Sequence, residues 1–251
     1  KYPNSKAYAD TCEKWINKIW EFFPNTEIGI VGGSKNQFKD WNQILTKRFN
    51  RNNKIHFILH HYPILYHEVD LEKIHEYQKF ISLSKFDLKK KLNEWKWNAT
   101  NNYSTWVTEF NIIQKTKRKI HNTWAHALFT SNQIHHFIEN TNVEILTFHS
   151  LGSNKFSQFS ALDLTNPVNG EFLMTAPGVT TYLWNKLILK ADQLNKIELN
   201  NSVWKIDDFK FNPIHAYQSI KNKTKQILIC NSSKKEYTIQ KSQIDIQDAQ
   251  I

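Results

Sequence analysis

Three apolar segments of the chain end in polar side chains that could do chemistry. The polar residues at these segment ends are His60, His61, Tyr62, Glu109, Asn111 and His149. A carboxylate on an otherwise apolar strand is costly to bury unless it is paired or hydrogen-bonded, so Glu109 most needs a functional explanation. A solvent-facing Glu, or a core His with satisfied nitrogens, is the alternative for each residue alone. The same change from apolar to polar residues occurs at all three segment ends, which favours one common site.

Four short apolar runs are predicted to be the strands that position these residues. The runs cover residues 27–33, 55–63, 104–112 and 143–151. Helical spacing of apolar residues is found before, between and after them, and residues 71–95 read as two helical pieces. The last helix is expected to start at Thr175 and Pro177 and to include Leu194. Strands that alternate with helices predict a parallel α/β sheet with right-handed crossovers.

The pattern changes near residue 195. From residue 196 onward short alternating segments separated by turn residues predict an antiparallel sheet. A complete eight-fold barrel typically needs about 250 residues, and only about 195 precede this change. We therefore expect residues 1–195 to be the C-terminal half of a (β/α)8 TIM barrel, from about helix 4 to helix 8, and residues 196–251 to be part of a β-sandwich. A doubly wound open sheet is the alternative, weakened by the absence of a glycine-rich phosphate loop.

Composition narrows the classes of function. Aromatic residues make up 14% of the 251 residues, which is typical of a packed or ligand-binding domain rather than a disordered one. The net charge of +10 keeps nucleic-acid binding open as a minor alternative, although scattered Lys is weak evidence for it. Cys12 and Cys230 match no metal spacing. We expect no metal, no cofactor and no membrane span, and the N-terminus has no signal-peptide core.

Parts of the sequence resemble the C-terminal half of the barrel in retaining glycoside hydrolases of clan A, above all α-L-arabinofuranosidases. The resemblance is carried by STWVTEFNI (104–112), NTWAHALFTSNQIHHFIENTNVEILTFHSL (122–151) and LMTAPGVTTYLWNKL (173–187). In that family the seventh strand ends in the nucleophilic Glu followed by an aromatic residue and Asn, which is similar to Glu109-Phe110-Asn111. The sixth strand ends in a His-aromatic-Tyr run, similar to residues 60–62.

The resemblance implies a role for each strand-end residue. Glu109 would be the nucleophile of a reaction that passes through a covalent glycosyl-enzyme intermediate. It must stay ionised, and Tyr62 would donate a hydrogen bond to it. His60 would line the sugar pocket, and Asn111 and His149 would contact the sugar. Trp106 is expected in the core.

The family's acid/base residue, in an Asn-Glu pair that ends the fourth strand, is expected in an N-terminal half missing from this chain. The expected partners are therefore a carbohydrate substrate and that missing half, with no nucleic acid and no membrane. The chain alone is expected to be inactive, and secretion to an extracellular or periplasmic location follows from the family. The flanking Thr108 and Phe110 differ from the usual acidic residue and Trp, which leaves the sugar open. A non-catalytic carbohydrate-binding relative is the second hypothesis.

Overall fold

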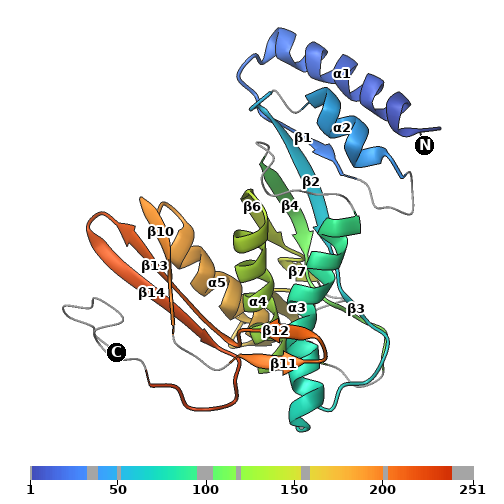
Figure 1. Ribbon diagram of the computed structural model, residues 1–251. Coiled ribbons are helices and arrows are strands. Elements are labelled where there is room, and N and C mark those ends of the chain that lie inside the picture. Colours follow the sequence, from blue (N-terminus) through green and yellow to red (C-terminus); the bar gives the residue numbers. More distant parts are fainter. Residues whose placement is uncertain are drawn as a thin grey trace. The chain divides into compact units, whose positions relative to one another are not determined.

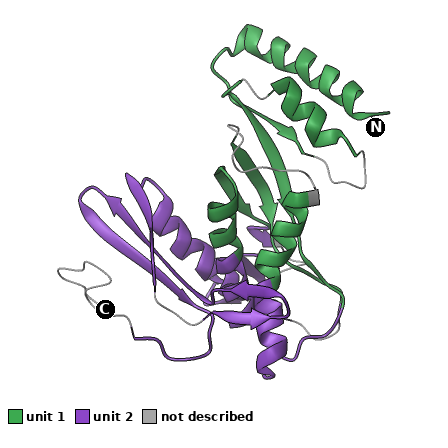
Figure 2. Cartoon of the chain, in the orientation of Figure 1, with its two compact units in different colours: residues 1–66, 83–115, 133–149 green, residues 67–82, 116–132, 150–251 purple. Residues whose placement is uncertain are grey.

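The computed structural model divides the chain into two compact units (Figure 2). The residues that it describes are 2–32, 39–49, 52–94, 104–116, 120–153, 159–199 and 203–238. Unit 1 consists of residues 1–66, 83–115 and 133–149, and unit 2 of residues 67–82, 116–132 and 150–251. Gly33 and Trp95, the last residues of the predicted segments 27–33 and 71–95, lie outside the described residues.

Unit 1 is built on a four-stranded parallel sheet (Figure 1). Its strands are β1 (Ile28–Val31), β2 (Ile55–His61), β4 (Thr105–Phe110) and β6 (Val143–Phe148). Each strand pairs in parallel with the next one along the chain, so the prediction of a parallel α/β sheet is confirmed. The strand order has no reversal of the kind that defines a doubly wound sheet. The order is that of a barrel segment, although the described strands do not close into a barrel.

Four helices accompany these strands in the sequence. They are α1 (Ser5–Phe22), α2 (Trp41–Phe49), α3 (Ile74–Glu94) and α4 (Trp124–Asn140). α1 begins where the Asn4 side chain accepts a hydrogen bond from the backbone N–H of Ala7, a standard N-cap. The prediction of two helical pieces between residues 71 and 95 is wrong, because α3 is continuous. None of the helices in the described part of the chain has the length and apolar character that crossing a bilayer requires.

The core of unit 1 is aromatic and lies on the sheet. Phe57, Phe110 and Phe137 are completely or almost completely buried, from β2, β4 and α4. The ring of Phe110 lies edge-on to Phe137 at 5.9 Å and to Phe148 at 5.6 Å. Burial of each such ring contributes about 1.5–3 kcal/mol, so the core holds the C-terminal ends of β2, β4 and β6 in place. A small parallel pair, β3 (Ile64–Leu65) with β5 (Ile113–Gln114), continues from two of these ends.

Unit 2 contains three antiparallel or mixed sheets and one complete helix. The strands are β7 (Gly152–Ser153), β8 (Leu162–Val168), β9 (Glu171–Met174), β10 (Gln193–Ile197), β11 (Trp204–Ile206), β12 (Phe209–Phe211), β13 (Ile214–Lys221) and β14 (Thr224–Asn231). The antiparallel pairs β10–β13, β13–β14 and β11–β12 confirm the strand-rich reading of the C-terminal region. The domain boundary at residue 195 stays a prediction.

The helix of unit 2, α5 (Ala176–Ile188), starts as the sequence predicts but ends earlier. The Thr175 side chain accepts a hydrogen bond from the backbone of Gly178, and Pro177 lies in the first turn. Leu194, expected on this helix, lies instead in β10, where it pairs with Ser219. The strand pairing with β13 therefore takes precedence over the helical spacing of Leu194.

Candidate active site

The register of the parallel sheet brings His60 and Glu109 side by side. His60 on β2 pairs with Glu109 on β4, and both lie near the C-terminal ends of their strands. The register shifts by one residue just before this pair, so that Thr108 is an extra residue on β4. Irregularities of this kind re-aim side chains and are frequent next to active sites. The C-terminal ends of parallel strands meet at one edge, which is where ligand sites of α/β sheets form.

Tyr62 donates a hydrogen bond to the Glu109 carboxylate. The Tyr62 hydroxyl lies 2.8 Å from Glu109 Oε2, so the contact expected from the sequence is confirmed. Burial raises the pKa of Tyr62 above its ordinary value, and the adjacent Glu109 carboxylate raises it further. The hydroxyl therefore stays protonated and remains a donor. The Glu109 side chain is 40% exposed, so a ligand can reach the carboxylate.

His60 lies at the edge of this pair rather than in direct hydrogen bonding with the carboxylate. Its Nδ1 atom is 3.9 Å from Glu109 Oε2, and its Nε2 atom is 2.9 Å from the Thr108 hydroxyl. The side chain is exposed, as a residue that faces a ligand would be. Thr108 fixes the ring orientation of His60 through this contact. No feature of the sequence predicts this role for Thr108.

His149 also belongs to this end of the sheet. It follows β6, and its backbone N–H donates to the carbonyl of Phe110 at 3.0 Å. Its ring lies edge-on to the ring of Tyr62, with 5.7 Å between the centroids. His149 is exposed, and its imidazole lies beside the Tyr62–Glu109 pair. Four of the five residues expected in the site are thus neighbours in the structure.

Asn111, the fifth residue, is completely buried and holds the backbone together. Its side-chain amide donates to the carbonyl of His149, and its side-chain oxygen accepts from the N–H of Ile112 at 2.7 Å. Its own N–H donates to the carbonyl of His61 at 3.3 Å. The structure therefore gives Asn111 a positioning role that connects the ends of β2, β4 and β6. Direct contact with a sugar stays a prediction.

Further polar contacts support the site from behind, and no local sequence pattern predicts them. His61 is buried, and its Nε2 atom lies 3.1 Å from Asp87 on α3. Gln133 on α4 donates to the backbone carbonyl of Asn111 at 3.3 Å and lies 3.4 Å from His61 Nδ1. Burial acts to raise the pKa of Asp87, but His61 and the nearby Lys91 outweigh it and lower the pKa.

Trp106 departs from the expected core position. It is half-buried, and its ring stacks on His56 rather than entering the aromatic core. Trp106 lies earlier on β4 than the register shift, toward the opposite end of the sheet from Glu109. It therefore contributes to a different group of side chains.

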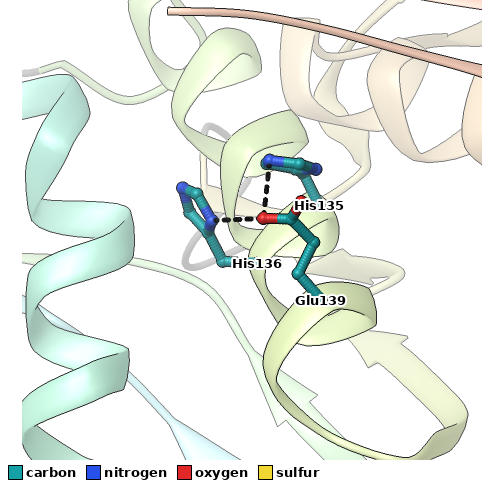
Figure 3. A group of neighbouring side chains, drawn as sticks. All are labelled: His135, His136 and Glu139. Atoms are coloured by element: carbon teal, nitrogen blue, oxygen red, sulfur yellow. Dashed lines mark ion pairs between the residues drawn. The ribbon is translucent and has the colours of Figure 1, made fainter. Parts of the chain in front are cut away.

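A separate cluster on α4 contains side chains of the types that bind metal ions. The buried His135 and His136 both turn toward the carboxylate of Glu139, as Figure 3 shows, at 3.1 and 3.8 Å. Burial lowers the pKa of His136 to about 4, so that ring is neutral at physiological pH. The nearby Lys85 and Lys89 contribute positive charge that acts in the same direction. The cluster thus combines two buried imidazoles, that of His136 in its neutral form, with the carboxylate of Glu139.

Solved structures of glycoside hydrolases share this fold at low sequence identity. AbfB, a family 51 alpha-L-arabinofuranosidase from Bifidobacterium longum, matches 91% of this chain with a TM-score of 0.68 and 12% identity. The GH51 arabinofuranosidase from Xanthomonas axonopodis pv. citri matches 91% with a TM-score of 0.59 and 12% identity. A 4-O-alpha-L-rhamnosyl-beta-D-glucuronidase from Fusarium oxysporum 12S also matches 91%, with a TM-score of 0.51 and 16% identity.

The matches cover only part of each solved structure. The chain spans 49%, 48% and 46% of these three proteins, which is about half of their length. No protein-family model matches the sequence, and no curated protein matches it either. At identities of 12–16%, these structural matches show similarity of fold alone. They support a glycosidase-like architecture, and the chemistry has to be argued from the side chains of the site.

Proposed function

We propose that this chain carries the nucleophile half of a retaining glycoside hydrolase active site, with Glu109 as the nucleophile. The observation that carries the proposal is the half-exposed Glu109 carboxylate, which accepts a hydrogen bond from Tyr62 at the C-terminal edge of a parallel sheet. The similarity of the fold to family 51 arabinofuranosidases supports the same assignment. The substrate class would be an oligosaccharide or polysaccharide, with arabinofuranose as the sugar to test first.

The geometry fits the demands of nucleophilic attack. The attacking carboxylate must be ionised, reachable and held in one orientation. Tyr62 supplies a donor that orients one oxygen of Glu109, and the exposed fraction of the side chain leaves room for an anomeric carbon. A neutral donor favours the ionised carboxylate without a buried positive charge. His60 and His149 lie beside this pair and would donate or accept hydrogen bonds with sugar hydroxyl groups.

The mechanism requires a second carboxyl group. Retaining glycosidases place two carboxyl groups about 5 Å apart, one as nucleophile and one as general acid and then base. We assign the second carboxyl group to a part of the protein outside residues 1–251, because this chain spans only about half the length of the solved structures. This chain alone would then bind a sugar weakly and turn over no substrate.

Steady-state kinetics tests the assignment of Glu109. The assay compares hydrolysis of an aryl α-L-arabinofuranoside by this chain alone, by the chain joined to its upstream half, and by the Glu109→Gln variant of the joined protein. We expect no turnover by the chain alone, and a loss of at least ~10³-fold in kcat for Glu109→Gln with little change in KM. The exposed Glu171 provides the matched control, because Glu171→Gln removes a carboxylate elsewhere.

Three results would contradict the proposal. Turnover by residues 1–251 alone would show that the acid/base group lies within this chain. Unchanged kcat in Glu109→Gln, with sugar binding retained, would move the chemistry to another residue. Sugar binding without turnover in the joined wild-type protein would instead indicate a non-catalytic carbohydrate-binding relative.

A further inference from the structure

The opposite end of the parallel sheet in unit 1 gathers a second group of ionisable side chains. Glu27 directly precedes β1, His56 is near the start of β2, and Glu144 is near the start of β6. One nitrogen or carboxylate oxygen from each of the three lies within 4.8 Å of the other two. At about 3.3 Å per residue, His56 is roughly 13 Å from His60 along β2. The function proposed for Glu109 makes no use of this group.

His56 is the unusual member. Its side chain is 3% exposed, and the buried Nε2 atom has no hydrogen-bond partner. The nearest carboxylate oxygen, Glu27 Oε2, is 3.4 Å away. Two ligand atoms that each lie about 2.0–2.1 Å from a tetrahedral Zn²⁺ are about 3.3 Å apart. The spacing of these two atoms is thus poor for a hydrogen bond and suitable for two ligands of one metal ion.

The other nitrogen and the ring of His56 are held by neighbouring side chains. Nδ1 forms a hydrogen bond with the Ser104 hydroxyl and lies 3.3 Å from Glu144 Oε2. The indole of Trp106 stacks on the imidazole at 4.4 Å, and its Nε1 atom donates to Glu144 Oε2 at 3.3 Å. Metal-binding histidines are usually fixed in this way, through the nitrogen that does not face the metal. Ser104 and Trp106 therefore orient both His56 and Glu144.

We propose that Glu27, His56 and Glu144 form a binding site for a divalent transition metal of the Zn²⁺ class. His56 would supply Nε2 and Glu27 its Oε2. Glu144, whose Oε2 lies beside Nδ1 and accepts from Trp106, would supply its other carboxylate oxygen, and a water molecule would complete a tetrahedral set. Glu27 and Glu144 are 59% and 49% exposed, so an ion from solution reaches them without unfolding of the sheet. The bound ion would tie together the N-terminal ends of β1, β2 and β6 and stabilise unit 1.

Titration of the metal-free protein with Zn²⁺ alone, followed by calorimetry, tests the site. We expect one equivalent of Zn²⁺ to bind, and Glu27→Gln and Glu144→Gln each to weaken it at least ~10-fold. Trp106→Phe keeps an aromatic ring over His56 but removes the N–H donor, and is expected to weaken binding by ~10–100-fold. Glu171→Gln and Glu139→Gln are the controls and should bind as the wild type does.

Co²⁺ spectroscopy and the pattern of variants give a second readout. Visible absorption of the Co²⁺-loaded protein should show tetrahedral coordination that is lost in Glu27→Gln. Absence of Zn²⁺ binding, or wild-type affinity in both glutamate variants, would overturn the proposal and leave His56 in contact with two carboxylates and no metal ion. Loss of binding in Glu139→Gln alone would place the metal on α4 and overturn it as well. Because the kinetic test of Glu109 uses no metal, the two proposals fail independently.

Discussion

Replacement of Asn111 by alanine should destabilise unit 1 much more than the loss of a few side-chain atoms would. The substitution removes the donor to the His149 carbonyl and the acceptor for the Ile112 N–H, and both partners are left without these hydrogen bonds. An unsatisfied buried group costs about 1–3 kcal/mol, so two of them sum to about 4 kcal/mol. The loss should be local to the ends of β2, β4 and β6, which Asn111 connects.

Native-state hydrogen exchange measures this loss within unit 1. About 4 kcal/mol corresponds to a ~10³-fold faster exchange of the protected β4 amides, since each 1.4 kcal/mol is tenfold. The exposed Asn195 on β10 provides the control, and Asn195→Ala should change exchange by less than ~0.5 kcal/mol. Exchange in Asn111→Ala within threefold of the wild type would refute the positioning role.

Three further predictions concern the site's support and unit 2. Tyr62→Phe should lower kcat of the joined protein by ~10–100-fold, because a hydrogen bond to a charged group is worth about 1.5–3 kcal/mol. Asp87→Asn should destabilise unit 1 above about pH 4 and lose this effect at lower pH, because His61 lowers the pKa of Asp87 in the folded state and acid removes that stabilisation. Gly178→Ala should cost about 3 kcal/mol or more, because a Cβ would lie 2.0 Å from the carbonyl oxygen of Ala161.

A different result would contradict each of these three predictions. Unchanged kcat in Tyr62→Phe would show that the Tyr62 hydroxyl does not contribute to catalysis. A stability difference between Asp87→Asn and wild type that persists at pH 2, measured by urea unfolding, would show that the charge of Asp87 is not responsible. Gly170→Ala is the control for Gly178, because a Cβ at Gly170 meets open space and only its positive φ of 80° is strained. Equal melting temperatures for the two glycine variants would contradict the packing argument.

Periodicity and capping residues predicted most of the elements because those signals are local. The four parallel strands and the start of α5 at Thr175 follow from residues within one or two turns of each other. The continuity of α3 did not follow, because the buried Ser82 and Ser84 occupy positions where the pattern requires apolar side chains. Small hydroxyl side chains can be buried in a helix without breaking it, and sequence spacing alone does not show this.

The residues of the candidate site could be predicted from the sequence, but the contacts that hold them in place could not. The switch from apolar to polar residues at strand ends identified Glu109 and Tyr62, since parallel strands end at one edge. The extra residue Thr108 depends on how β2 and β4 pair, and no local pattern encodes that register. Asp87 reaches His61 from a different helix, and a lone acid among lysines looks solvated in the sequence. Contacts between distant segments are thus the part that required the structure.

Covalent trapping shows directly whether Glu109 is the nucleophile. The joined protein is treated with a 2-fluoro arabinofuranoside that carries a good leaving group, and its proteolytic peptides are then analysed by mass spectrometry. We expect one added glycosyl group on the peptide that contains Glu109, and none in Glu109→Gln, because a retaining mechanism passes through a covalent intermediate on the nucleophile. A glycosyl group on any other carboxylate, in a protein that turns over the substrate, would contradict it.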